Sequence, residues 1–243
     1  MNKEERPLIR SSVRSLVEFL MRSGDLDTRK RTTDPEAMLK GGQIHRKLQR
    51  QAGSSYHYEV PLKLESKRED FILSVEGRAD GIYEDKKGQT WVDEIKGTYM
   101  NIEKLEEPVP VHLAQAKCYA FMLAKQEHLS RVGVRMTYVS LVTEKIHSFK
   151  QVLSYKELKA WYEALLSEFE KWISFQMQWR KIRNASMQNL PFPFPYREGQ
   201  RRLVSSVYHA IQKKQQLFCN TAKFFRIYLK FTFLYCLQIR RNL

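Results

Sequence analysis

The spacing of apolar positions changes twice in the first half of the chain. Over residues 11–25 they recur every three or four positions, which predicts an amphipathic helix that stops at Ser23-Gly24-Asp25. A second helix is expected over residues 35–51, with Asp34 as its cap. Residues 56–97 instead contain three runs rich in β-branched and aromatic residues, separated by turn-forming stretches. This region is predicted to be a meander of antiparallel strands.

The second half alternates between the two patterns. Residues 111–126 return to helical spacing, residues 132–142 read as a strand, and residues 145–153 are expected to pair with that strand as a hairpin. Residues 155–183 form one long helical pattern with its acidic residues early and its basic residues late, as the helix dipole favours. The sequence therefore predicts a mixed α/β fold, with a central sheet flanked by helices and a domain end near residue 188.

Charge adds a possible partner to this picture. The formal net charge of the chain is +15, which makes a polyanion such as DNA or RNA the first partner to consider. Nine of the basic residues lie between Gly199 and the C-terminus, where no acidic residue occurs, so the rest of the chain is only mildly basic. Net charge alone is therefore weak evidence for nucleic-acid binding.

Other sequence features limit the cellular compartments and cofactors to be expected. The three cysteines are too few and too scattered for a disulfide framework or an iron–sulfur cluster, which fits a reducing cytoplasm. The charged N-terminus does not read as a secretory signal. The apolar run at residues 228–237 is too short to span a bilayer, so no membrane segment is expected.

The candidate chemistry lies in two neighbouring strands. Alternation along residues 92–97 places Glu94 and Lys96 on one face and Asp93 on the other, and Asp80 at the end of a neighbouring strand could bring a second carboxylate beside Glu94. Two carboxylates suit a hard cation such as Mg²⁺ or Mn²⁺, and the ammonium of Lys96 could orient water or stabilise a phosphate. The plain alternative is that Asp80 caps a turn and that Glu94 and Lys96 form a solvated ion pair.

Residues on the flanking helices extend this set. His45 lies on the second helix, upstream of the sheet, where its imidazole could bind a metal or simply face solvent. Gln115 and Tyr119 are four positions apart and share one face of the helix after the meander. His112 could face the same cleft as a phosphate contact, or could be exposed at the start of that helix.

Taken in order, these residues resemble the RecB-like branch of the PD-(D/E)XK nucleases. In that family a helical His, an Asp after a Gly-Arg-x strand, an (Asp/Glu)-x-Lys strand and a Gln-x-x-x-Tyr helix follow one another, as they do here across residues 40–120. The resemblance implies that His45, Asp80 and Glu94 bind Mg²⁺ or Mn²⁺ with the Ile95 carbonyl. It also implies that Lys96 positions the attacking water, and that Gln115 and Tyr119 position the substrate. Some relatives carry four cysteines for an iron–sulfur cluster, and none is expected here.

The C-terminal part resembles the opening of a DinG/XPD-type DNA helicase, because an aromatic-Arg-x-Gly-Gln element ends at Gln200. There the Gln reads the adenine edge, and a glycine-rich phosphate loop follows. No glycine follows Gly199, so we expect a chain interrupted before that loop and lacking ATPase activity. The expected domains are a nuclease domain over 1–188, the start of a helicase over 189–218 and an atypical tail over 219–243. A short amphipathic helix that docks on a partner is the alternative for the tail.

Together these expectations describe a metal-dependent deoxyribonuclease of DNA repair or recombination, acting on single strands or ends, with a helicase as a possible partner. The competing hypothesis is a catalytically silent DNA-binding module that guides a helicase.

Overall fold

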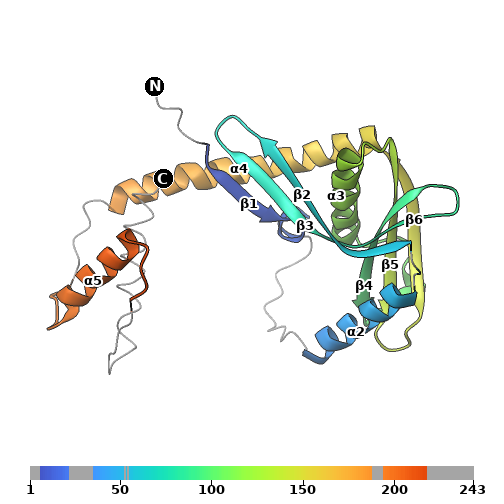
Figure 1. The fold of residues 1–243 in the computed structure, drawn as a ribbon, viewed down its shortest axis with the longest axis horizontal. Coiled ribbons are helices and arrows are strands. Elements are labelled where there is room, and N and C mark those ends of the chain that lie inside the picture. The colour runs from blue at the N-terminus through green and yellow to red at the C-terminus, as the bar shows by residue number, and fades with distance from the viewer. Residues whose placement is uncertain (1–5, 22–34, 52, 54, 188–193, 218–243) are drawn as a thin grey trace. The chain divides into compact units, whose positions relative to one another are not determined.

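The computed structural model describes residues 6–21, 35–51, 53, 55–187 and 194–217. They form a mixed α/β structure, as predicted, with a six-stranded sheet flanked by helices (Figure 1). The chain divides into two compact units, Met1–Glu170 and Lys171–Leu243. The whole sheet lies in the first unit. Of the helices within the described ranges, none combines the length and the apolar composition needed to cross a bilayer.

The predicted meander is confirmed. The strands β2 (Tyr56–Lys67), β3 (Ile72–Glu84) and β4 (Thr90–Thr98) follow one another as antiparallel neighbours. The predicted hairpin is present as β5 (Arg131–Ser140) and β6 (Ile146–Ser154). β4 and β5 are parallel, and the chain between them includes the helix α3 (Pro110–Gln126), so the sheet is mixed.

One strand was missed at the sequence level. Residues 8–12 form β1 (Leu8–Ser12), which pairs in parallel with β3, and the helix expected from residue 11 begins only after it, as α1 (Val13–Leu20). A five-residue strand has too few positions to show alternation, and its pairing partner lies about sixty residues away in the sequence. The predicted helix end at Ser23–Asp25 and the cap at Asp34 lie outside the described residues.

The helices cover both faces of β4. α3 is buried over most of its length and packs on β4 and β5, and α1 packs against α3. The helix α2 (Pro35–Gln51) contacts β4 from the other face, where Ile44 packs with Ile95. Strand alternation explains this arrangement, because Glu94 and Lys96 face α3 while Ile95 faces α2.

The long helix α4 (Tyr155–Ser186) begins with a reciprocal cap. The Ser154 hydroxyl accepts from the Glu157 N–H, and the Glu157 carboxylate accepts from the Ser154 N–H at 2.8 Å. Its first half packs on α3 through Tyr162, whose ring centroid lies 4.6 Å from that of Phe121. The second unit contains the remainder of α4 and the helix α5 (Gln200–Gln212).

Candidate functional site

The sheet opens along one edge of β3. Its other edge pairs with β2, whereas this edge pairs with β1 over residues 72–76 and with β4 over residues 81–84. Residues 77–80 lie between these two ladders, and we call this interval the fork. The pairing of β2 also skips Asp80, opposite Glu59, whose φ of 52° is left-handed and marks a local irregularity. β4 therefore diverges from β3 just after Asp93.

Asp80 lies at the fork and connects β3 to β4. Its Oδ2 accepts a hydrogen bond from the Ile95 backbone N–H at 2.8 Å. That N–H has no strand partner on this side because β3 and β4 have separated, and the carboxylate takes the place of one. The N–H and C=O of a strand residue point to the same edge, so the Ile95 carbonyl also faces the fork. Asp80 is thus inside a strand, which continues to Glu84, and neither ends the strand nor caps a turn.

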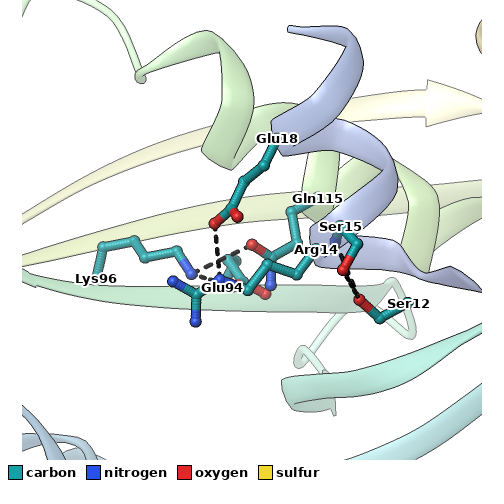
Figure 2. Close-up of polar contacts among 7 residues, drawn as sticks. All are labelled: Ser12, Arg14, Ser15, Glu18, Glu94, Lys96 and Gln115. Atoms are coloured by element: carbon teal, nitrogen blue, oxygen red, sulfur yellow. Dashed lines mark hydrogen bonds and ion pairs between the residues drawn. The ribbon is translucent and has the colours of Figure 1, made fainter. Parts of the chain in front are cut away.

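Glu94 and Lys96 form a buried ion pair above the fork (Figure 2). The Lys96 Nζ lies 2.7 Å from Glu94 Oε1, and the two side chains are 25% and 0% exposed. A solvated surface pair is therefore excluded. A fully buried carboxylate is costly unless positive charge lies close to it, which makes this pair unlike the exposed ion pairs elsewhere on the sheet.

α3 covers the site and contributes Gln115 and Tyr119 to it. The Lys96 ammonium also donates to Gln115 Oε1 at 3.3 Å, so the lysine is held between β4 and α3. Tyr119 lies one turn further along and contacts the fork directly, since a Cβ built on Gly77 would be 2.6 Å from its hydroxyl. Burial first, and then the charges of Glu94 and Asp80, raise the pKa of Tyr119. Its hydroxyl therefore lies within the influence of both carboxylates and stays protonated.

His112 faces the same side of α3. Its Nδ1 lies 3.2 Å from the Tyr138 hydroxyl, which also accepts from the Val109 N–H at 2.9 Å. A tyrosine hydroxyl can both donate and accept, so its contact with Nδ1 forms with either neutral tautomer of the imidazole. Burial first, and then the charges of Lys96 and Arg14, lower the pKa of His112 to about 4. A fully exposed histidine at the helix start is excluded.

The structure adds two residues that the sequence did not single out. Arg14 and Glu18 of α1 form an i, i+4 pair, with 2.7 Å between Nε and Oε1. Figure 2 shows them beside Glu94, Lys96 and Gln115. The helical pattern of residues 11–25 was visible, but no sequence signal related that helix to the sheet.

The remaining predicted ligands stay untested. His45 lies in α2, but its side chain lies outside the described residues. Within the part of the chain that the structure describes, no three His, Cys, Asp or Glu side chains form a metal-binding group. Gln200 belongs to the second unit, where its Oε1 accepts from the Arg197 N–H at 2.8 Å. The adenine contact expected for Gln200 stays a prediction.

No protein-family model and no curated protein matches the chain. Among solved structures, the crystal structure of SSO0001 is similar to it, with a TM-score of 0.44 and 19% sequence identity. The similarity covers 69% of this chain and 78% of that one. A likeness at this level carries no inference about function.

Proposed function

We propose that the chain is a metal-dependent nuclease that hydrolyses phosphodiester bonds of DNA at the fork. The observation that carries the proposal is the placement of Lys96, whose ammonium contacts both the buried Glu94 carboxylate and Gln115 at an open edge of the sheet. Asp80 lies at the same edge. Paired acids and a lysine with this arrangement suit the hydrolysis of a charged phosphate ester.

The donor atoms fit a hard divalent cation. The carboxylates of Asp80 and Glu94 and the carbonyl of Ile95 are all oxygen ligands, which Mg²⁺ and Mn²⁺ prefer. These three residues would hold the ion. When bound, it would polarise the phosphate and lower the pKa of water.

The chain's own residues would supply the remaining steps. Glu94 and Gln115 fix the Lys96 ammonium, so that the ammonium can orient the attacking water and stabilise negative charge on the phosphate. The protonated Tyr119 hydroxyl can donate to a phosphate oxygen but cannot act as a base near neutral pH. His112, whose pKa is lowered to about 4, is neutral near pH 7 and can contact a phosphate oxygen through a ring N–H.

The test is cleavage of end-labelled single-stranded and duplex DNA in Mg²⁺, Mn²⁺ or EDTA. We expect metal-dependent cleavage that falls by about 100-fold or more in Asp80→Asn and Lys96→Met, because each removes a charge that acts on the transition state. Glu65→Gln is the matched control, since Glu65 is an exposed acid on β2 paired with Lys63. Circular dichroism would confirm that the variants are folded.

Two outcomes would contradict the proposal. Well-folded protein that binds DNA but cleaves no substrate with either metal would favour the silent binding module. Cleavage that persists in Asp80→Asn and Lys96→Met would show that the activity comes from another site or a contaminant.

A further inference from the structure

The first turn of α1 is directed to the fork by the register of β1. The last pair of the parallel ladder joins Ser12 to Glu76, and the helix begins at the next residue. β4 leaves β3 after the pair of Asp93 with Gly81. The first turn of α1 and the diverging part of β4 therefore lie at opposite ends of the same four-residue interval.

The first turn of α1 is held by core packing and by an N-terminal cap. Val13, Leu16 and Val17 are fully buried, so one face of α1 is anchored in the core. The Ser12 hydroxyl accepts from the Ser15 N–H at 3.0 Å and caps the helix. A side chain on the opposite face is consequently presented to solvent from a fixed backbone.

Arg14 lies at the border between the buried and the outer face, about 100° around the helix from Val13. Its side chain is 74% exposed, and Glu94 is near enough that its charge, after the Glu18 hydrogen bond and charge, raises the pKa of the Arg14 guanidinium (Figure 2). The hydrogen bond to Glu18 uses Nε, one part of a group that has five N–H donors. Glu18 thereby holds the guanidinium in place while the group stays open to a ligand from solvent.

The charges support a phosphate as this ligand. After burial, the charges of Lys96 and Arg14 both lower the pKa of His112, so both cations lie near its imidazole. A guanidinium matches phosphate oxygens with a planar pair of donors, whereas an ammonium acts as a point charge. Arg14 and Lys96 are two cations of different geometry near the Glu94 carboxylate. Such a pair suits a nucleic-acid strand, which presents successive phosphates.

We propose that Arg14, held by Glu18, binds a phosphate of the substrate strand next to the phosphate that is cleaved. The inference rests on the proposed function, because it deepens the description of the same site. Arg14 is then an anchor for the nucleic-acid backbone and gives the site affinity for a polyanion independently of base sequence.

The test separates anchoring from cleavage. Binding of labelled oligothymidylate is measured in EDTA over a series of salt concentrations for the wild type, Arg14→Gln and Arg14→Lys. Loss of one contact to single-stranded nucleic acid should make the slope of log K against log salt less steep by about 0.7. We expect this change and weaker binding in Arg14→Gln, and the wild-type slope in Arg14→Lys. Lys63→Gln on β2, at the other edge of β3, is the matched loss of one charge.

The outcomes distinguish this inference from the nuclease proposal. A wild-type slope in Arg14→Gln would overturn the role of Arg14 and leave the nuclease proposal standing. A reduced slope in a protein that never cleaves would support the phosphate anchor and overturn the nuclease. Failure of the wild type to bind or cleave any oligonucleotide would overturn both. Because the Arg14 side chain is exposed, the Arg14→Gln variant should unfold at the same temperature as the wild type. An unchanged Tm would exclude misfolding as the cause of a reduced slope.

Discussion

Single residues at the fork have properties that depend on atoms from distant elements. His112 is the clearest case, because its lowered pKa comes from burial and then from the charges of Lys96 in β4 and Arg14 in α1. Gly77 is another, because the Tyr119 hydroxyl occupies the space that a Cβ would need. Because Gly77 of β3 has no side chain, the Tyr119 ring of α3 can lie against the fork.

The depressed pKa of His112 predicts acid sensitivity. Between about pH 6.5 and pH 4 the unfolded chain binds a proton on His112 that the folded chain does not, so the free energy of unfolding falls as pH decreases through this window. Below about pH 4 this contribution should level off. We expect His112→Gln to lose part of this pH dependence, as measured by urea unfolding at pH 7, 6, 5 and 4. His128→Asn, at an exposed histidine, controls for removal of a histidine. Parallel profiles for wild type and His112→Gln would refute the assignment.

At the scale of elements, β4 carries different chemistry on its two faces. Opposite the Glu94 face, Asp93 accepts from the Tyr56 hydroxyl at 2.9 Å and from Thr137 Oγ1 at 2.7 Å, and pairs with Arg135 at 2.5 Å. These partners come from β2 and β5, so one carboxylate connects three strands. The Arg135 guanidinium also stacks on Tyr83 of β3, 4.5 Å from its ring centroid. The network fixes the sheet where β3 and β4 begin to separate.

We expect Asp93→Asn to destabilise the protein by about 3–5 kcal/mol, because it leaves the largely buried Arg135 cation without its carboxylate. Denaturant unfolding at neutral pH would measure this loss. Glu65→Gln breaks an exposed pair with Lys63 and should cause little change by the same measurement. An Asp93→Asn variant as stable as Glu65→Gln would show that the network contributes little to the sheet.

At the scale of the whole molecule, the fork forms only because β1, β3, β4, α1 and α3 meet. β1 and β4 share one edge of β3, α1 follows β1, and α3 covers the opening. The metal and nucleic acid expected at this place would bind the folded chain and not the unfolded one. Such binding must therefore raise the stability of the fold.

Thermal unfolding gives a test that needs no substrate. At a Mn²⁺ concentration about 100 times the Kd, binding adds about 2.7 kcal/mol, which corresponds to a rise in Tm of about 5–10 °C for a domain of this size. We expect this rise to disappear in Asp80→Asn, to reverse with EDTA and to persist in Glu65→Gln. An equal rise in Asp80→Asn would place the ion elsewhere.

The sequence by itself determined most of the elements and the faces of β4. Helical and strand periodicity are local, so they identified α3, α4 and the strands of the meander, and alternation correctly placed Asp93 on the opposite face from Glu94. The order of charged residues pointed to Asp80, Glu94 and Lys96 without showing how they meet.

Tertiary structure decided which of these faces meet. The fork depends on where two ladders end on β3, and strand pairing joins residues far apart in sequence, so no local pattern reports it. For the same reason β1 was missed, and Asp80 was expected at a strand end although it lies within β3. Arg14 lies near Glu94 only because a five-residue strand sets the position of α1. Burial of Glu94 likewise follows from packing of α3 on β4, which periodicity alone does not specify.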